Sequence, residues 1–326
     1  MSLAPIVLFV YKRPWHTQQT LEALAANELA DQSILYIFAD GPQTDATEEQ
    51  KEKIRQVREL IRSRKWCKEV HIVERQRNWG LADNIIDGVT QIVNRYGRII
   101  VLEDDLVTSP GFLRYMNEAL ELYANEPRVM HISGYMFPVE GKLPDTFFYN
   151  ANSCWGWATW ARAWKYFIND PLYLYRQVTK SKNSIRRFNI ENSCPFTSQL
   201  EANIIGTLKT WCVRWYASFF IAGGYALYPR CSLVNNIGHD SSGEHCNAEG
   251  QNVYYCKELA LHIPVQKQPV KENLLVRQLM QDFYKNRLKI EPFEPPSPYS
   301  FKNKLAKCLP NGVVKFYRWL KNYTGK

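Results

Sequence analysis

Short apolar segments alternate with helix-forming segments through the first third of the chain, and this alternation restricts the fold more than any other feature. The apolar segments have the length and composition of buried strands, and they span residues 6–10, 34–39, 70–74 and 99–102. Helical patterns between them cover residues 15–26, a segment that follows a predicted capping box of Asp45 and Glu48 and runs to about Arg64, and residues 81–97. Strands joined by helices pair in parallel, which predicts a doubly wound α/β sheet.

The pattern continues beyond these strands and then gives way to a different composition. Ser109 and Pro110 predict the start of a further helix, and residues 129–133 and 226–229 predict two more strands. Residues 154–164, CWGWATWARAW, hold four tryptophans. Tryptophan rings fill ordinary cores and also stack on sugars, so the second half is either a packed core or a platform for a bulky partner.

Three consecutive carboxylates, Glu103, Asp104 and Asp105, follow the fourth predicted strand. Adjacent carboxylates repel one another, and their burial is costly unless a cation compensates the charge. Mg²⁺ and Mn²⁺ prefer such oxygen ligands and complete their coordination shells with substrate phosphates. The triplet therefore indicates either a metal-assisted site for a nucleotide diphosphate or an acidic turn that faces water.

Other polar residues follow the neighbouring strands. Arg13 comes after the first strand, Asp40 after the second, and Asn84 lies in the segment RQRNWGLADN after the third. Ligands of open α/β sheets bind beyond the carboxyl ends of the strands, so these side chains are predicted to line one rim together with the triplet.

A polar loop closes the globular part of the sequence. Its residues, LVNNIGHDSSGEHC, include His239, Asp240, Glu244 and His245 within seven positions. The loop is either a solvated connection or, because Gly and Ser make it adaptable, a segment that brings His245 to a metal or phosphate.

The positive charge of the chain is concentrated at its end. The 326 residues carry a formal charge of +9, and the part from Pro295 onward has seven Lys or Arg and no acid. After the proline-rich residues 292–298, apolar residues recur at helical spacing over 301–320 with basic residues between them. This basic amphipathic helix fits an anionic membrane surface, or else docks on the protein itself. No nucleic-acid partner is expected.

The cysteines and the first residues indicate the compartment. The eight cysteines form no CxxC pair, so reduced thiols are the default, and the first apolar run is too short for a signal peptide. The expected location is cytoplasmic, peripheral on the inner face of the cell membrane. The expected domains are a nucleotide-binding half at 1–135, an acceptor half at 136–265 and an extension at 266–326.

Six segments in order resemble one known family. They are PIVLFVYKRP, Asp40-Gly41, RNWGLADN, VLEDDLVTSPGF, CWGWATW and LVNNIGHDSSGEHC. Together they resemble bacterial inverting glycosyltransferases of the GT-A fold, family-two-like and nearest to the N-acetylglucosaminyltransferase I-like enzymes. The resemblance covers about residues 4–250 and implies a mostly parallel central sheet flanked by helices, with a C-terminal helical extension.

The resemblance also implies roles for particular residues. Arg13 and Asp40 would contact the nucleotide of a donor, favoured to be a UDP-sugar, and Asn84 would lie near its ribose or diphosphate. In the EDD form of the family's DXD motif, Asp105 would bind Mn²⁺ or Mg²⁺. His245 of the polar loop is the further metal ligand expected from the sequence itself. Glu103 and Asp104 would contact the donor sugar, the ribose or metal-bound water. Tryptophans would contact a saccharide or glycolipid acceptor, and they are Trp155, Trp157 and Trp211.

The catalytic base is expected in the second half of the chain. The resembling enzymes carry an acidic residue in a tryptophan-flanked segment, whereas the corresponding segment here, TWCVRW, has Cys212 and Val213 between its tryptophans. The candidates are Glu201, ranked first, then Asp240 and Glu244.

Two other functions are weighed against a glycosyltransferase of cell-surface polysaccharide or lipopolysaccharide assembly. A sugar-phosphate nucleotidyltransferase needs a glycine-rich loop after the first strand, and the residues at 11–14, YKRP, contain no glycine. A non-catalytic carbohydrate-binding scaffold would explain why TWCVRW has no acidic residue. It would not explain the carboxylate triplet.

Overall fold

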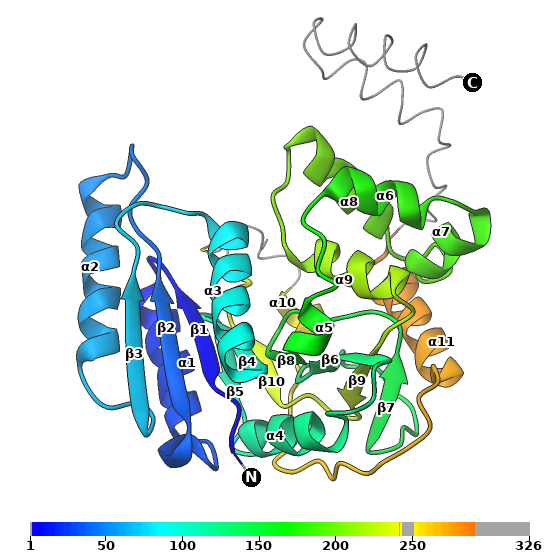
Figure 1. Cartoon of the computed structure of the whole chain (residues 1–326), viewed down its shortest axis with the longest axis horizontal. Helices are drawn as coiled ribbons and strands as arrows, with labels where there is room; N and C mark the ends of the chain where they lie inside the picture. The colour runs from blue at the N-terminus through cyan, green and yellow to red at the C-terminus, as the bar shows by residue number, and fades with distance from the viewer. Residues whose placement is uncertain (1, 241, 243–250, 291–326) are drawn as a thin grey trace, which may run out of the picture.

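The structure, a computed structural model, describes residues 2–240, 242 and 251–290. Its centre is an eight-stranded sheet with the order β3-β2-β1-β4-β8-β6-β9-β7 (Figure 1). The first four strands along the chain pair in parallel, and they are β1 (Ile6–Val10), β2 (Ile34–Ala39), β3 (Glu69–Glu74) and β4 (Arg98–Glu103). Every residue of β1 is buried, as expected for an apolar strand covered on both faces.

The second half of the sheet is mixed. β8 (Trp157–Trp160) lies antiparallel between β4 and β6 (Val129–Ser133), so β6 runs in the direction of β4. β9 (Tyr225–Pro229) pairs in parallel with β6, and β7 (Thr146–Tyr149) pairs antiparallel with β9 at the edge. A separate ribbon joins β5 (Leu106–Thr108) to β10 (Val234–Asn236). The predicted fold class, an α/β fold with a mostly parallel central sheet flanked by helices, is confirmed.

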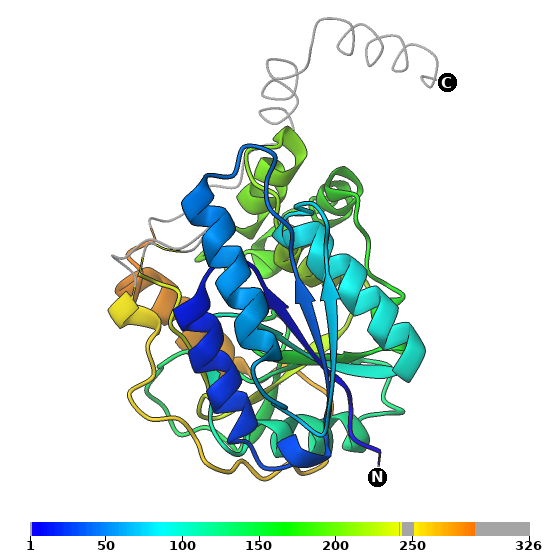
Figure 2. The same cartoon turned by 90° about the vertical axis from the view of Figure 1, so that its left-hand side faces the viewer.

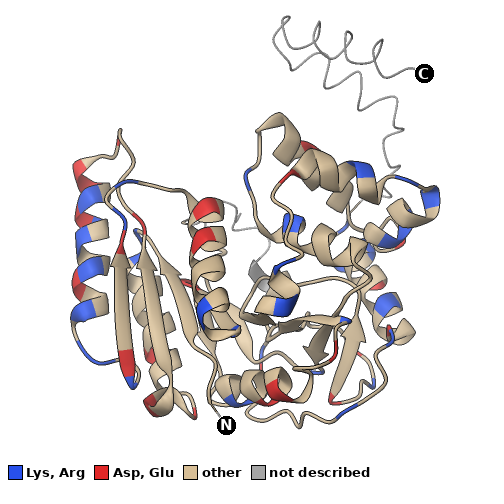
Figure 3. Ribbon diagram, in the orientation of Figure 1, with Lys and Arg blue, Asp and Glu red and all other residues tan. Residues whose placement is uncertain are grey.

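Helices cover both faces of the first half. α1 (Pro14–Ala25) and α2 (Glu48–Arg62) lie on one face, and α3 (Leu81–Tyr96) lies on the other (Figure 2). The outer face of α2 alternates acidic and basic side chains, which pair at helical spacing and face solvent (Figure 3). The remaining helices are α4 (Phe112–Leu122), α5 (Ala161–Trp164), α6 (Pro171–Val178), α7 (Lys182–Phe188), α8 (Phe196–Ile205), α9 (Cys212–Ile221), α10 (Gln251–Tyr254) and α11 (Leu274–Asp282).

Two predicted helix starts are wrong. The capping box of α2 is formed by Thr47 and Gln50, whose side chains each accept a hydrogen bond from the other's backbone N–H, at 3.2 and 3.1 Å. The cap of α4 is Gly111 rather than Ser109. The Ser109 N–H donates to the carbonyl of Leu233 at 2.8 Å, which extends the β5–β10 ribbon by one bond and keeps Ser109 outside the helix.

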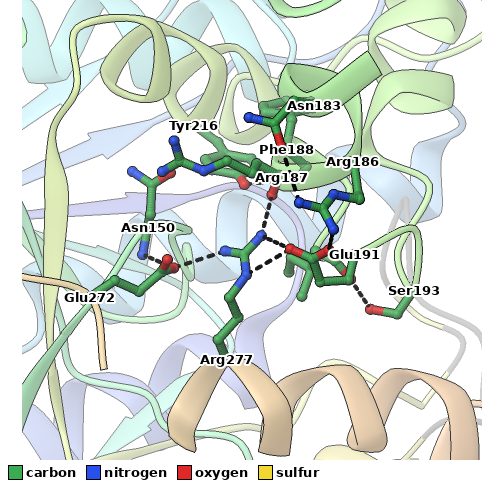
Figure 4. Close-up of polar contacts among 11 residues, drawn as sticks. Asn150, Asn183, Arg186, Arg187, Phe188, Glu191, Ser193, Tyr216, Glu272 and Arg277 are labelled. Atoms are coloured by element: carbon green, nitrogen blue, oxygen red, sulfur yellow. Dashed lines mark hydrogen bonds and ion pairs between the residues drawn. The ribbon is translucent and has the colours of Figure 1, made fainter. Parts of the chain in front are cut away.

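Core packing continues past residue 265, the predicted end of the acceptor half. Val276 and Met280 of α11 are buried, and Glu272 bridges to Phe148 of β7. Arg277 joins this segment to the helical part of the second half, because its guanidinium donates to both Glu272 and Glu191 at 2.9 Å (Figure 4). The predicted basic helix at 301–320 lies outside the described residues.

A buried histidine lies among the tryptophans of the second half. The Trp215 Nε1–H donates to Nδ1 of His131 at 3.2 Å, so His131 is neutral and its Nε2–H donates to the Ser153 carbonyl at 3.1 Å. The ring stacks on Trp157 with the two ring centroids 5.3 Å apart. Burial lowers the pKa of His131 to about 3.

This histidine predicts a pH dependence of stability. Below the ordinary histidine pKa of about 6.5 the unfolded chain binds a proton that the native state does not, so the free energy of unfolding falls by up to about 1.4 kcal/mol per pH unit. The stabilisation is complete above this pH and is lost progressively towards pH 3. Urea denaturation at pH 7.5 and 5.5 should show this decrease in the free energy of unfolding for the wild type. The decrease should be smaller in His131→Gln. It should be as large as in the wild type in His71→Gln, because the His71 ring is half exposed. An equal decrease in all three proteins would contradict the assignment.

Candidate active site

A cavity of about 240 Å³ opens beyond the carboxyl ends of β1, β2 and β4. Both halves of the protein form its wall. The first half contributes Phe9, Val10, Tyr11, Lys12, Arg13, Asp40, Asn78, Gly80, Leu81, Asn84, Glu103, Asp104 and Asp105. The second half contributes Cys154, Trp155, Thr210, Trp211, Cys212, Asn236 and Ser242. Arg13, Asp40, Asn84 and the triplet therefore meet at one rim, because parallel pairing brings their strand ends to the same edge.

Asp40 holds the loop that forms one side of the cavity. Its Oδ1 accepts from the backbone N–H groups of Gly41 and Trp79, at 2.8 and 2.9 Å. Its Oδ2 accepts from the Gly80 N–H at 3.0 Å and from the Asn78 amide at 3.1 Å. Burial raises the pKa of Asp40 despite the opposing effect of these donors. Four bonds fill the acceptor positions of a carboxylate, so Asp40 acts here as a positioning residue, and its contact with a nucleobase stays a prediction.

Asn84 is oriented by Arg75. The Arg75 Nε–H donates to Oδ1 of Asn84 at 3.2 Å, and the same guanidinium is paired with Asp87. It also lies over the Trp79 ring, 3.9 Å from the ring centroid. The loop after β3 and the first turns of α3 thus form one connected unit beside the cavity.

Asp104 and Asp105 of the carboxylate triplet are buried and Glu103 is half-buried, and one cation partly compensates their charge. The Arg13 Nη2 is paired with Asp104 and with Asp105, 2.8 Å from the Asp105 Oδ2. Burial raises the pKa of Asp104, although Arg13 opposes the rise. Burial and the nearby Cys154 thiol raise the pKa of Glu103 well above its ordinary value. Burial lowers the pKa of Arg13, but the two aspartates outweigh it, so the net pKa lies above the ordinary value.

The donor set fits a divalent cation that is shared with a ligand. In the described part of the chain, no group of three or more His, Cys, Asp or Glu side chains is arranged to hold a metal ion by itself. Mg²⁺ and Mn²⁺ commonly need only one or two carboxylates when substrate phosphates supply further oxygens. The Nη1 of Arg13 is buried and has no hydrogen-bond partner among the described residues, which fits an anionic oxygen in the cavity beside the carboxylates.

Two of the three predicted acceptor tryptophans line the cavity. Trp155 is half-buried and contacts the ring of Tyr135, and Trp211 lies next to Cys212 at the start of α9. Trp157 is fully buried and stacks on Trp211, with ring centroids 5.0 Å apart. Trp211 is itself only 2% exposed, so Trp155 is the one of the three tryptophans with appreciable surface for an acceptor in this structure.

The predicted bases lie away from the cavity or outside the described residues. Glu201 of α8 is buried and accepts from the Tyr175 hydroxyl at 2.9 Å. The Asp240 Oδ2 lies 3.0 Å from the His16 Nε2. Hydrogen bonds from Ser242 outweigh the effect of burial and lower the pKa of Asp240, so this carboxylate is a weaker base than an ordinary aspartate. Glu244 and the predicted metal ligand His245 are not among the described residues.

Sequence reasoning did not single out Asn78, Gly238 or the paired thiols of Cys154 and Cys212. Asn78 was marked only by its place in a polar loop after a strand. Gly238 leaves no room for a side chain, because an added Cβ would overlap the Asp105 carboxylate and lie 2.8 Å from the Arg13 Nη1. The free thiols of Cys154 and Cys212, which are far apart in the sequence, both lie on the cavity wall, and the neighbouring Cys212 thiol together with burial raises the pKa of Cys154.

Comparison with known proteins identifies the first half. Residues 6–131 match the family model described as Glycosyl transferase family 2. No curated protein matches the chain. The matched residues contain Arg13, Asp40, Asn84 and the triplet.

The solved structures that match parts of the chain include three at low identity. S. aureus TarS is 11% identical over 43% of this chain, with a TM-score of 0.28, and the chain spans only 23% of its length. The TarS fragment 1–349 is 11% identical over 71% of this chain and 59% of its own, with a TM-score of 0.37. Mouse xyloside xylosyltransferase 1 is 12% identical over 66% of this chain and 80% of its own, with a TM-score of 0.34.

The family match and the sheet together define the fold. It is the α/β GT-A fold of nucleotide-sugar transferases, and residues 6–131 within it match the glycosyltransferase family.

The role of Asp40 in holding its loop can be tested by hydrogen exchange. In Asp40→Asn one oxygen becomes an amide nitrogen that cannot accept, so two of the four donors lose their acceptor. Protection of the Trp79 or Gly80 amide should fall by about tenfold or more, the effect of losing roughly 1.4 kcal/mol. Asp45→Asn, at an exposed position nearby, should leave both amides unchanged. Unchanged protection in Asp40→Asn would contradict the positioning role.

Proposed function

We propose that the chain transfers a sugar, with inversion and with the help of Mn²⁺ or Mg²⁺, from a nucleotide-sugar donor to a saccharide or glycolipid acceptor. A UDP-sugar is the favoured donor. The observation that carries the proposal is the shared cavity, in which the carboxylate triplet and Arg13 face a wall that includes tryptophan and cysteine side chains. Such a cavity offers separate surfaces to an anionic donor and to a sugar acceptor.

The donor side is proposed to bind through charge and through the loops at the strand ends. Asp105 would bind the divalent cation, which supplies Lewis acidity to the departing diphosphate. Glu103 and Asp104 would contact the donor sugar, ribose or metal-bound water, and Asn84 would lie beside the ribose or diphosphate. Their fixed positions at strand ends support this, because pre-oriented groups stabilise developing charge without reorganising.

The acceptor side is proposed to position a sugar ring against Trp155 and Trp211. An inverting reaction needs a base that removes the proton of the attacking hydroxyl. Among the described residues, the second half contributes no carboxylate to the cavity wall. The base is therefore proposed from Glu201, Asp240 and Glu244, of which Glu244 follows the wall residue Ser242 by two positions in the sequence.

The finer identity of the enzyme is also a proposal. The six sequence segments support an N-acetylglucosaminyltransferase I-like enzyme of bacterial cell-surface polysaccharide or lipopolysaccharide assembly. No described helix is long and apolar enough to cross a membrane. Cytoplasmic location and contact with an anionic membrane through residues 301–320 remain predictions from the sequence.

Release of nucleoside diphosphate from a panel of UDP-, GDP- and TDP-sugars tests the proposal. We expect release with Mn²⁺ or Mg²⁺, none with chelator, and a loss of about 100-fold or more in Asp105→Asn, because the leaving group loses its cation. Asp31→Asn, an exposed carboxylate elsewhere, should retain activity.

Full activity in chelator, or a normal rate in Asp105→Asn, would refute the metal-dependent mechanism. Sugar binding without any release of nucleotide would favour a binding scaffold instead.

A further inference from the structure

Arg13 occupies the position of a counter-cation between two aspartates. It follows β1, whereas Asp104 and Asp105 follow β4, and these two strands are direct neighbours in the sheet. Its Nη2 contacts Oδ1 of Asp104 and Oδ2 of Asp105, and the three side chains are 17%, 7% and 11% exposed. At this burial the guanidinium is the main compensation for both negative charges.

The rest of the guanidinium is not used by this ion pair. Nη1 is buried without a hydrogen-bond partner among the described residues, although Arg13 lines the cavity. The segment after β10 covers the pair from one side, where the Ile237 N–H donates to the Asp105 carbonyl at 2.9 Å and Gly238 leaves no space for a side chain. Arg13 is therefore held at one nitrogen and unsatisfied at the other.

A divalent cation that binds Asp105 through Oδ2 would meet the Arg13 guanidinium on the same oxygen. Mg²⁺-like ions bind carboxylate oxygens at about 2.1 Å, whereas Nη2 lies 2.8 Å from the same Oδ2. Both cations on one oxygen would place like charges side by side in a buried site, which is strongly unfavourable. Either the Arg13 guanidinium or the divalent cation can occupy these carboxylate oxygens, but not both at once.

We propose that Arg13 and the divalent cation compete for Asp104 and Asp105, and that the displaced guanidinium then binds the donor diphosphate. This inference rests on the proposed function, because it assumes that a cation and a nucleotide bind in this cavity. Arg13 is thus a positioning residue with two sets of partners. Cation binding and diphosphate binding support each other through it, and such coupling is reciprocal between the two ligands.

Calorimetric titration of the full chain with Mn²⁺ alone tests the competition. Arg13→Met removes the competing cation, so Mn²⁺ should bind at least about tenfold more tightly than to the wild type. Lys12→Met is the matched control, because it removes the same charge from the same cavity while Lys12 lies over the Tyr11 ring rather than on the aspartates. Its Mn²⁺ affinity should stay within about threefold of wild type.

The same titration with UDP tests the second half of the proposal. In the presence of saturating Mn²⁺, Arg13→Met should bind UDP about tenfold more weakly than the wild type, since one charge-assisted contact to phosphate is lost. Tighter Mn²⁺ binding together with weaker UDP binding is the expected combination, and a general loss of structure does not produce it.

A measurement on the wild type covers the case in which Arg13→Met does not fold. The ¹⁵N–¹H signals of the Arg13 guanidinium should shift on addition of Mg²⁺ alone, because the ion pair opens. Equal Mn²⁺ affinity in wild type and Arg13→Met, or guanidinium signals unchanged at saturating Mg²⁺, would overturn the exchange while leaving metal dependence intact. Absence of Mn²⁺ binding to the wild type even with UDP would instead refute the metal-dependent function itself, and the exchange with it.

Discussion

Buried negative charge at the end of β4 determines how the cavity is built. Three carboxylates in succession are unfavourable in a protein interior, and the nearest compensation comes from Arg13 on the adjacent strand. Parallel pairing of β1 with β4 places these groups together, and the same pairing with β2 brings in Asp40. The first half is thus a set of strand ends whose negative charge is partly compensated by Arg13, and one nitrogen of its guanidinium has no hydrogen-bond partner among the described residues.

The second half meets this edge with a different kind of chemistry. The reversal of direction at β8 brings the tryptophan-rich segment back beside β4, so that Trp155 and Trp211 face the carboxylates across the cavity. Behind them, Trp157 and the neutral His131 form a buried aromatic layer. A weakly polar wall opposite a charged rim suits the proposed transfer from an anionic donor to a sugar acceptor.

Much of this arrangement could be predicted from the sequence. The strands β1 to β4, β6 and β9 follow from short apolar runs between turn signals, and the common rim of Arg13, Asp40, Asn84 and the triplet follows from the rule for strand ends. The GT-A fold inferred from six motifs is confirmed. These features depend on local patterns, which a sequence displays directly.

The remaining features depend on contacts between distant segments. Three contacts can be seen only in the folded chain. They are the hydrogen bonds from the loop at 78–80 to Asp40, the pairing of Arg13 with both aspartates and the burial of Trp157. The cap of α2 was misplaced because two acceptable boxes lie two residues apart, and Ser109 was misread because the β5–β10 ribbon uses its N–H. The sequence alone could not decide between the two capping boxes or show that the N–H of Ser109 belongs to the ribbon.

The central claim is that the carboxylate triplet forms a cation site shared with the diphosphate of a donor. Anomalous diffraction from crystals of the full chain grown with Mn²⁺ and UDP tests it directly. The expected result is a manganese peak about 2.1 Å from a carboxylate oxygen of Asp105, with the diphosphate on its other side. A nucleotide bound elsewhere, or bound in the cavity with no manganese at Asp105, would contradict the claim.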